Sequence, residues 1–339
     1  MSIGVGVVGF GYWGPNLARN LAVADGVDLV AVCDADPRAQ ARVQRLYPGV
    51  RTYAALDELL ADGGVDAVVV ATPVRSHADF ALAALRSGRH VLVEKPMAET
   101  VAQAERMVEI AAAKGLTLMV DHTFVYTGAV ARIAAMVQAG ELGRLLYYDS
   151  VRINLGLFQS DVDVLWDLAV HDLSILDHLT GAMPVEVSCI THSHFPDTPA
   201  NMAYLTLFYG DGLIAHTHVN WLSPVKIRQT VLGGERRMVV YDDIEPDEKL
   251  KIYDRGVSFS GAADLSAARR VDYRSGDVII PALERGEALA GVVGAFRDAV
   301  TIGRPLSTDG RAGLRVVRIL EAAGRSAKER GRAVLLRGE

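Results

Sequence analysis

The first 120 residues alternate between short apolar runs and segments with helical spacing, and this rhythm restricts the possible fold more than any other feature of the chain. The apolar runs have the length of buried strands and lie at Ile3–Phe10, Val27–Cys33, Val65–Ala71, His90–Glu94 and Leu116–Val120. Helices are expected between them, after Gly14 and at Pro37–Leu46, Ser76–Leu85 and Thr100–Lys114. Strands joined through helices form right-handed βαβ units, so the sequence predicts an α/β fold with a doubly wound parallel sheet.

After residue 120 the pattern changes to strands joined by turns rich in Gly, Asp and Pro. Strands are expected at Leu145–Asn154 and at 185–194, 202–209, 213–221, 226–233, 236–241 and 249–253. Helices are expected at Val130–Gln138, Asp163–Leu179, Leu289–Thr301 and Asp309–Arg330. Consecutive strands with short turns form antiparallel or mixed sheets. The chain is therefore predicted to have two domains, 1–120 and 121–339, the second of the α+β type.

Composition excludes several classes of protein. Half of the residues are hydrophobic, which excludes a disordered chain, and the net charge of −6 argues against a nucleic-acid partner. No apolar run has the length of a membrane span, and no charged segment typical of a signal peptide precedes the first strand. Cys33 and Cys189 are too few and too far apart for a disulfide framework. We expect a cytoplasmic protein with reduced thiols and no membrane contact.

The most informative motif directly follows the first predicted strand. It has the form G-x-G-x-x-G and consists of Gly9, Phe10, Gly11, Tyr12, Trp13 and Gly14. Between a strand and a helix, the first glycine permits a tight turn, the second lets the backbone approach a pyrophosphate, and the third allows close helix–strand packing. The N-terminus of the helix then offers N–H groups to the phosphates. We expect a dinucleotide site at this loop.

Asp34 indicates which dinucleotide binds. It ends the second predicted strand, about 20 residues beyond the glycine loop, where an acid accepts hydrogen bonds from the ribose hydroxyls. The same carboxylate repels a 2′-phosphate, which favours NAD over NADP as the cofactor. Arg38 lies close by in the sequence and could accommodate a phosphate, so NADP stays open as an alternative.

Three segments resemble one protein family. They are the loop GFGYWGPNLARN, the run ATPVRSHADFALAALRSGRHVLVEKP at 71–96, and the helix WDLAVHDLSILDHLTG at 166–181. Together they are similar to the Gfo/Idh/MocA oxidoreductases, named for glucose–fructose oxidoreductase and inositol dehydrogenase. The resemblance implies an N-terminal Rossmann domain and a C-terminal domain with an open, mainly antiparallel sheet. It also implies a homodimer or homotetramer assembled through that sheet.

The catalytic candidates follow from the chemistry of hydride transfer. A secondary alcohol that is oxidised needs a group for its hydroxyl proton and a cation near the developing alkoxide. Lys95 follows the strand HVLVE and so lies at the carboxyl edge of the sheet, where ligands bind in open α/β folds. Asp167 and His171 are four residues apart on one predicted helical face, where a carboxylate can orient an imidazole. The resemblance implies that His171 is the general base and Lys95 its electrostatic partner or relay, and which of them carries the proton stays open.

Further candidates line the two halves of the expected site. Cofactor contacts are predicted at Thr72, Pro73, His77, Glu94 and Lys95, besides the glycine loop and Asp34. Substrate contacts are predicted at His122, Tyr126, Arg152, Asn154, Gln159, Asp161 and Asp163, besides Asp167 and His171. Lys226 and Arg228 are candidates for a substrate diphosphate. The pairs His192/His194 and His216/His218 have strand spacing that could hold zinc, but we expect packing roles and no metal.

Several functions remain open on the sequence. The main hypothesis is an NAD-dependent dehydrogenase that oxidises a ring hydroxyl of a sugar, with C3 favoured, in a sugar-nucleotide or an aminoglycoside or amino-sugar antibiotic pathway. Asp161, Asp163 and the net charge of −6 mildly favour a cationic substrate. The alternatives are an NADPH-dependent 3-ketosugar reductase, an inositol or polyol dehydrogenase, and a dinucleotide sensor without catalysis.

Overall fold

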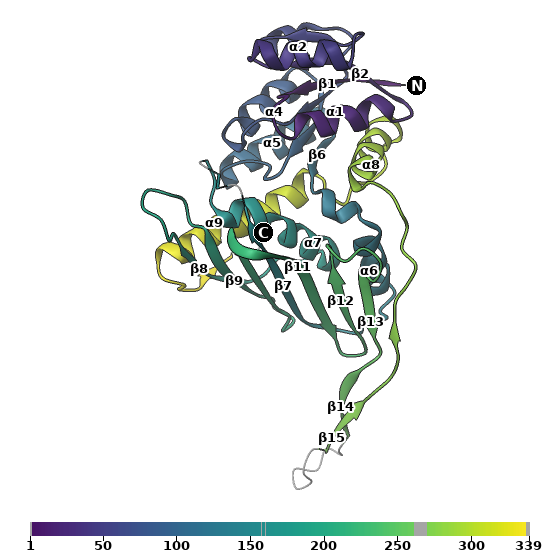
Figure 1. Cartoon of the computed structure of the whole chain (residues 1–339), viewed down its shortest axis with the longest axis vertical. Helices are drawn as coiled ribbons and strands as arrows, with labels where there is room; N and C mark the ends of the chain where they lie inside the picture. Colours follow the sequence, from purple (N-terminus) through teal and green to yellow (C-terminus); the bar gives the residue numbers. More distant parts are fainter. Residues whose placement is uncertain (1, 157, 160, 261–269, 337–339) are drawn as a thin grey trace. The chain divides into compact units, whose positions relative to one another are not determined.

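The computed structural model describes residues 2–156, 158–159, 161–260 and 270–336 (Figure 1). The chain divides into two compact units. Unit 1 comprises Met1–Thr127, Leu173–His178 and Gly286–Glu321, and unit 2 comprises Gly128–Asp172, Leu179–Arg285 and Ala322–Glu339. The prediction placed everything after residue 120 in a second domain, whereas part of the C-terminal region belongs to unit 1.

Unit 1 is built on a six-stranded parallel sheet. The strands lie in the order β3 (Arg51–Tyr53), β2 (Val27–Cys33), β1 (Ile3–Val8), β4 (Ala67–Val70), β5 (His90–Glu94) and β6 (Leu118–Asp121). Because every residue of β1 and β4 is buried, these central strands are apolar throughout. The strand order reverses between β1 and β4, and open sheets bind ligands at the carboxyl ends of the strands beside such a switch point. The predicted α/β fold is confirmed.

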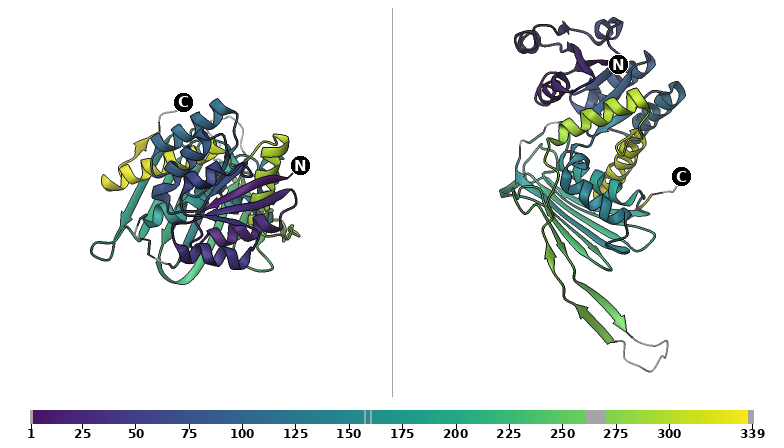
Figure 2. Two further views of the ribbon diagram at one scale, coloured as in Figure 1. Left: turned by 90° about the horizontal axis from the view of Figure 1, so that it is seen from above. Right: turned by 90° about the vertical axis from the view of Figure 1, so that its right-hand side faces the viewer.

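Helices surround this sheet within unit 1 (Figure 2). Their bounds are α1 (Gly14–Val23), α2 (Pro37–Leu46), α3 (Leu56–Ala61), α4 (His77–Arg86), α5 (Val101–Lys114) and α8 (Ala288–Ile302), with 3₁₀ turns η1 (Val74–Ser76) and η2 (Thr123–Tyr126). In α8 the buried residues Leu289, Val292, Val293 and Phe296 have helical spacing and join the core cluster of β1 and α1. This apolar stripe explains why a segment so late in the sequence belongs to unit 1.

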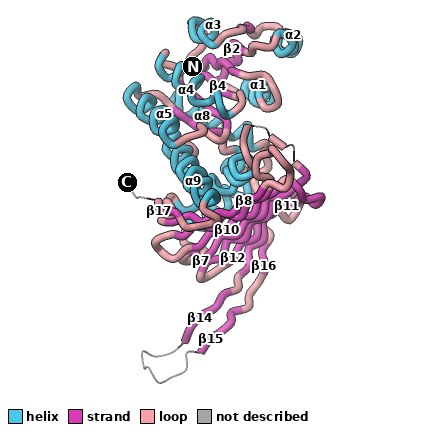
Figure 3. Tube along the Cα trace, turned by 90° about the vertical axis from the view of Figure 1, so that its left-hand side faces the viewer, coloured by secondary structure: helices cyan, strands magenta, loops and turns pink. Residues whose placement is uncertain are grey.

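Unit 2 contains a nine-stranded sheet, drawn in magenta in Figure 3. The strands lie in the order β16 (Val278–Ile279), β13 (Leu250–Tyr253), β12 (Met238–Asp242), β11 (Leu222–Gly234), β7 (Leu145–Leu155), β10 (Ile214–Asn220), β9 (Met202–Phe208), β8 (Glu186–His192) and β17 (Val334–Leu335). Only the pair β7–β10 is parallel among the described strand pairs of this sheet. The predicted mainly antiparallel sheet is thus confirmed.

The remaining elements complete the two units. They are α6 (Gly128–Gln138), a π-helical turn (Leu165–Ala169), α7 (Val170–Thr180), α9 (Gly310–Lys328) and a ribbon of β14 (Gly256–Ser260) with β15 (Arg270–Arg274). The short elements β3, α3 and β14 to β17 were not predicted, since each is too short for a clear period. Within the described part of the chain, no helix combines the length and apolar composition required to cross a bilayer.

Candidate active site

The glycine loop of unit 1 has the geometry of a phosphate-binding turn. Gly9 has a φ of 94°, and a Cβ atom there would lie 2.7 Å from the Ala71 carbonyl oxygen. A Cβ atom at Gly14 would overlap the carbonyl oxygen of Gly9. Around Gly11, by contrast, a Cβ atom would meet no described atom within 4 Å. Gly9 and Gly14 therefore close the turn, and Gly11 leaves open space where a pyrophosphate can approach the backbone.

The helix that follows this loop leaves its N-terminus available to an anion. Helix α1 begins at Gly14, its N-cap residue Trp13 makes no side-chain capping bond, and its first turn contains no acidic residue. The first N–H groups of a helix have no partner inside the helix, and the helix dipole favours a negative charge there. The residues present thus fit the diphosphate of a dinucleotide.

Asp34 lies at the carboxyl end of β2, where its carboxylate is fixed by the backbone. One oxygen accepts from the N–H of Phe10 at 2.7 Å and the other from the N–H of Asp36 at 2.9 Å. Asp34 lines a pocket of about 340 Å³ with Phe10, Gly11, Asp36, Arg38, Ala39 and Arg42. Carboxylate oxygens have further lone pairs, so Asp34 can still accept from ribose hydroxyls. Asp34, which is predicted to select NAD, and Arg38, which could bind the 2′-phosphate of NADP, thus line the same pocket.

His77 connects the turns after β4 and β5. It is 1% exposed, and its ring nitrogens lie 2.8 Å from the carbonyl oxygens of Thr72 and Pro96. Both nitrogens face carbonyl oxygens, and a neutral imidazole donates to one of them, so His77 links these turns within unit 1. The predicted cofactor residues Thr72 and Pro73 lie on the first of these turns, where Pro73 is exposed and the Thr72 hydroxyl accepts from Ser76 at 2.8 Å.

Lys95 follows β5 and lies among buried ionisable groups of unit 1. Glu94 and Asp121 are register partners at the carboxyl ends of β5 and β6, and they are 7% and 1% exposed. Burial raises the pKa of both carboxyl groups, and the charge of Asp121 raises that of Glu94 further. His122 is 2% exposed, and burial together with the charge of Lys95 lowers its pKa to about 3. His122 is therefore neutral at physiological pH.

Two buried ring nitrogens in this region lack partners. Among the described residues, none forms a hydrogen bond with Nδ1 or Nε2 of His122, whereas the carboxyl groups of Glu94 and Asp121 are hydrogen-bonded to each other. Buried polar groups in folded proteins are nearly always hydrogen-bonded, so unsatisfied atoms of this kind indicate a place for a ligand or an ordered water. Their position beside Lys95 at the carboxyl edge fits a nicotinamide and a reacting hydroxyl.

Tyr126, predicted from the sequence as a substrate contact, has a hydrogen-bonding partner inside unit 1. Its hydroxyl lies 2.9 Å from the hydroxyl oxygen of Thr308, and burial raises its pKa to about 12. The phenol therefore remains protonated and connects η2 to the chain segment before α9. This contact gives Tyr126 a structural partner within unit 1.

The predicted helix around Asp167 consists of the π-helical turn Leu165–Ala169 followed by α7. Asp163 and Asp167 accept hydrogen bonds from residues of unit 2. Asp163 precedes the helix, and its Oδ1 accepts from the N–H groups of Leu165 and Trp166 at 3.0 and 3.1 Å. Asp163 thus caps the helix through Oδ1, and its predicted contact with the substrate stays a prediction. Asp167 lies on the π-helical turn and accepts a 3.1 Å hydrogen bond from the indole N–H of Trp221. Turns of this kind occur frequently at functional sites.

His171 and the remaining substrate candidates differ in exposure. His171 is half-buried in the first turn of α7, four residues after Asp167 as predicted. Asn154 on β7 and Gln159 in the following loop are half-buried, while Asp161 is exposed. Trp221 was not singled out from the sequence, because nothing in the sequence around it indicates that it contacts Asp167.

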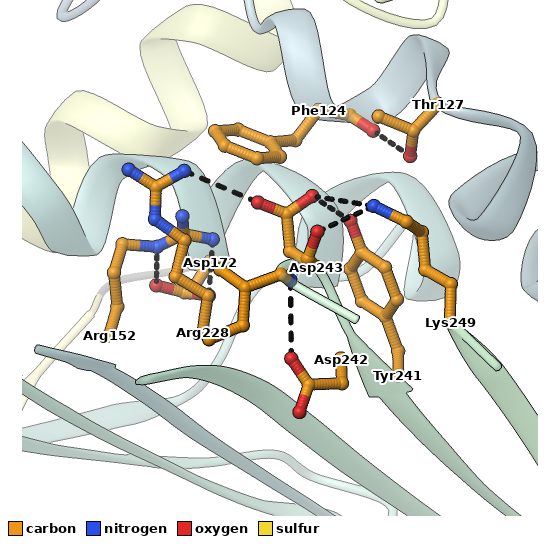
Figure 4. Close-up of polar contacts among 10 residues, drawn as sticks. Phe124, Thr127, Arg152, Asp172, Arg228, Tyr241, Asp242, Asp243 and Lys249 are labelled. Atoms are coloured by element: carbon orange, nitrogen blue, oxygen red, sulfur yellow. Dashed lines mark hydrogen bonds and ion pairs between the residues drawn. The ribbon is translucent and has the colours of Figure 1, made fainter. Parts of the chain in front are cut away.

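Arg152 is part of a buried ion pair in unit 2 (Figure 4). Its guanidinium donates to both oxygens of Asp172 at 2.8 and 3.1 Å, and each side chain is 3% exposed. This pair gives Arg152 an acidic partner inside unit 2, and its predicted contact with the substrate stays a prediction. Arg228 also has an acidic partner, since its Nη1 donates to Asp243 at 3.2 Å, and Lys249 lies 3.8 Å from the same carboxylate. Arg228 is therefore not an unpaired cation waiting for a diphosphate.

The histidine pairs make contacts within the sheet of unit 2. His216 lies 3.0 Å from the hydroxyl of Thr206, and His218 lies 3.0 Å from the amide of Asn220. The His218 ring stacks on Tyr204 with centroids 4.4 Å apart. No group of three possible metal ligands gathers within the described ranges of the chain.

Comparisons with known proteins agree with these two units. The model of an oxidoreductase family with an NAD-binding Rossmann fold, GFO_IDH_MocA, matches residues 3–122. A model of the GFO/IDH/MocA C-terminal domain matches residues 130–240.

Three relatives cover different parts of the chain. A UDP-N-acetylglucosamine 3-dehydrogenase of Acidithiobacillus ferrooxidans is 29% identical over 92% of this chain and 93% of its own. An inositol 2-dehydrogenase of Saccharopolyspora erythraea is 34% identical over 53% of this chain and 55% of its own. The crystal structure of GenD2 from gentamicin A biosynthesis, in complex with NAD, matches with a TM-score of 0.84 at 26% identity, covering 99% of this chain and 97% of that one.

Proposed function

This chain belongs to the Gfo/Idh/MocA oxidoreductase family and has its NAD-binding Rossmann domain, and on that premise we propose that it is an NAD-dependent sugar dehydrogenase. The reaction we propose is the oxidation of a ring secondary hydroxyl, with C3 as the favoured carbon. The supporting relatives are the UDP-N-acetylglucosamine 3-dehydrogenase and GenD2, both of which match along nearly their whole lengths. By the relation to GenD2, we place the reaction in the biosynthesis of an amino-sugar antibiotic.

One observation carries the proposal. Unit 1 combines an open phosphate loop, an acid fixed at the end of β2, and a lysine beside the buried His122, whose ring nitrogens have no hydrogen-bond partner among the described residues. These features follow one another along the carboxyl edge of one parallel sheet. A protein that only sensed a dinucleotide would need the loop and Asp34, but it would have no use for Lys95.

We propose Lys95, Asp167 and His171 as the catalytic residues. Bound NAD⁺ supplies the acceptor for the hydride that leaves the alcohol carbon. Either the hydroxyl proton passes to His171 while the ammonium group of Lys95 stabilises the developing alkoxide, or it passes to the neutral amine of Lys95, which thereby becomes the ammonium. Asp167, held by the indole of Trp221, orients the substrate or the imidazole. Glu94, Asp121 and His122 complete the polar surroundings of Lys95, with His122 in its neutral form.

A homo-oligomer is part of the proposal. On β9 the residues Ala203, Leu205 and Leu207 are buried, whereas the alternating Tyr204 is 41% exposed. Ile190 and Ile214 on the neighbouring strands are 56% and 46% exposed. Exposed large apolar side chains on a sheet face favour a protein interface, and a second copy of this chain is the proposed partner.

The direct test is NADH formation, followed by absorbance, with a panel of candidate alcohols. The panel contains UDP- and dTDP-hexoses, amino-sugar glycosides and free inositols, each with NAD⁺ and with NADP⁺. We expect turnover of at least one hexose derivative with NAD⁺. Turnover restricted to free inositols would replace the proposal by a polyol dehydrogenase. NADH binding without turnover of any alcohol or ketosugar would replace it by a dinucleotide sensor.

Asp34 provides a second test, because Arg38 and Arg42 line the same pocket and leave NADP as the alternative cofactor. We expect Asp34→Asn to lower the ratio of kcat/KM for NAD⁺ to that for NADP⁺ by about 10- to 100-fold, since the charge that repels a 2′-phosphate is removed. The matched control is Asp36→Asn in the same pocket, which keeps a helix cap and should change the ratio little. A wild-type enzyme that prefers NADP⁺ would contradict the assignment of Asp34.

A further inference from the structure

Three aromatic side chains of unit 2 form a connected group beside Asp167. The ring of Phe158 lies 5.4 Å from that of Trp221 and 5.7 Å from that of Phe195, measured between centroids. Trp221 is buried, and its indole N–H donates to Asp167, whereas Phe158 and Phe195 are 43% and 50% exposed. The group therefore joins the proposed catalytic carboxylate to an exposed aromatic surface, which we call the aromatic platform.

The platform is held in place by its own loop. The hydroxyls of Ser193 and Thr198 donate to the carbonyl oxygen of Phe195 at 2.9 and 3.0 Å. Nearby, the backbone carbonyl of Asn201 accepts from the N–H of Trp221 at 3.0 Å. The side-chain NH₂ group of Asn201 is buried and has no hydrogen-bond partner among the described residues. An aromatic surface with a few spare polar groups is the usual composition of a small-molecule site.

The stretch of sequence that contains the platform carries acidic residues and no lysine or arginine. No lysine or arginine occurs in the sequence between Arg152 and Lys226, a stretch that includes Asp167, His171 and all three platform residues. The same stretch contains the acidic residues Asp161, Asp163, Asp167, Asp172, Asp177, Glu186, Asp197 and Asp211. A diphosphate would need fixed cations, and this stretch supplies none.

Three of the cations near the ends of this stretch in unit 2 have acidic partners. Arg152 is buried against Asp172, while Arg228 and Lys249 share the carboxylate of Asp243, as Figure 4 shows. Recruiting any of them to a substrate phosphate would leave a carboxylate without its partner, which is costly for a buried group. Lys226 is exposed on β11 and is the cation that a nucleotide substrate would have to use.

From the aromatic platform and the lack of lysine and arginine in residues 153–225, we infer that the sugar substrate is unphosphorylated and carries one or more ammonium groups. The inference rests on the proposed dehydrogenase function. An ammonium group is attracted to the face of an aromatic ring, and acidic surroundings raise the local concentration of a cation. A nucleoside diphosphate would instead be repelled by the same surroundings.

The test compares three matched alcohols in the NADH assay with the full-length wild-type enzyme. They are methyl 2-amino-2-deoxyglucopyranoside, its N-acetyl derivative and UDP-N-acetylglucosamine. We expect kcat/KM for the amine to exceed that for each of the other two by about tenfold or more, and to fall as salt is added. A higher kcat/KM for the UDP sugar, lowered by Lys226→Ala, would overturn the inference and leave the dehydrogenase function standing. Failure of all sugars in both directions would overturn the function itself.

Variants of the platform separate its role from the overall charge. We expect Phe158→Ala and Phe195→Ala each to raise KM for the amine about tenfold, with little change in the dissociation constant of NADH. The control is Tyr273→Ala, which removes an aromatic side chain that is 82% exposed on β15. An unchanged KM in both phenylalanine variants, with folded protein by circular dichroism, would remove the platform from the substrate site.

Discussion

Replacing Lys95 with alanine is expected to lower kcat for sugar oxidation about 10³-fold, because the variant loses both a proton-transfer group and the cation beside the alkoxide. The charge of Lys95 influences Glu94, Asp121 and His122, so its removal also changes the electrostatics of the surrounding pocket. Initial rates of NADH formation at saturating substrate measure the effect. A melting temperature close to that of the wild type shows that the loss is chemical.

Two lysine variants control for this result. Lys114→Ala removes an exposed lysine of α5 that donates to the carbonyl of Arg86, and it should keep kcat within about twofold. Lys95→Arg keeps the charge but transfers a proton poorly, so it should recover only part of the loss. If Lys95→Ala retained kcat within tenfold, or if Lys114→Ala lost as much, Lys95 would not be catalytic.

A double variant addresses the division of work between Lys95 and His171. Residues that act as a unit in one step show non-additive losses, as catalytic groups generally do. We therefore expect Lys95→Ala with His171→Ala to be scarcely slower than the worse single variant. Multiplied losses would indicate that the two side chains act in separate steps.

The sequence predicted the fold of unit 1 well where local pattern determines structure. The glycine loop, the apolar strands and Asp34 are local signals, and the structure places the loop directly between β1 and α1. The sequence did not predict which distant segments pack together. Helix α8 has an ordinary amphipathic pattern, and nothing in that pattern shows that its apolar stripe packs against β1 and α1. Strand β3 was missed because its sequence, Arg-Thr-Tyr, is short and only half-buried.

The predicted site residues show the same limit. Polar residues that bind ligands and polar residues that satisfy one another look alike in sequence. His77, Asp163 and Arg152 were all chosen as possible ligand contacts, and each makes hydrogen bonds to other groups of the protein. The partners lie on other segments, so only the fold reveals them. The sequence did not predict the aromatic platform, because Phe158, Phe195 and Trp221 are far apart in the sequence and meet only in the fold.

Arg152 and Asp172 support the largest stability prediction. Either Arg152→Met or Asp172→Leu leaves one ionised group without its partner in a site where both side chains are 3% exposed. Breaking a buried pair in this way costs about 3–5 kcal/mol, so each single variant should unfold at a clearly lower urea concentration. Asp172 also accepts a hydrogen bond at its backbone carbonyl from Tyr148, which both variants preserve.

The double variant Arg152→Met/Asp172→Leu distinguishes a structural pair from a substrate contact. Replacing a buried pair with apolar residues of similar volume is often neutral, so the double variant should recover most of the stability lost by either single variant. It should also keep the KM for the sugar close to the wild-type value, because the pair is enclosed within unit 2. Single variants that unfold like the wild type but raise the KM of the sugar tenfold would return Arg152 to the substrate site. They would also weaken the case for an unphosphorylated substrate, since a cation would then face the sugar.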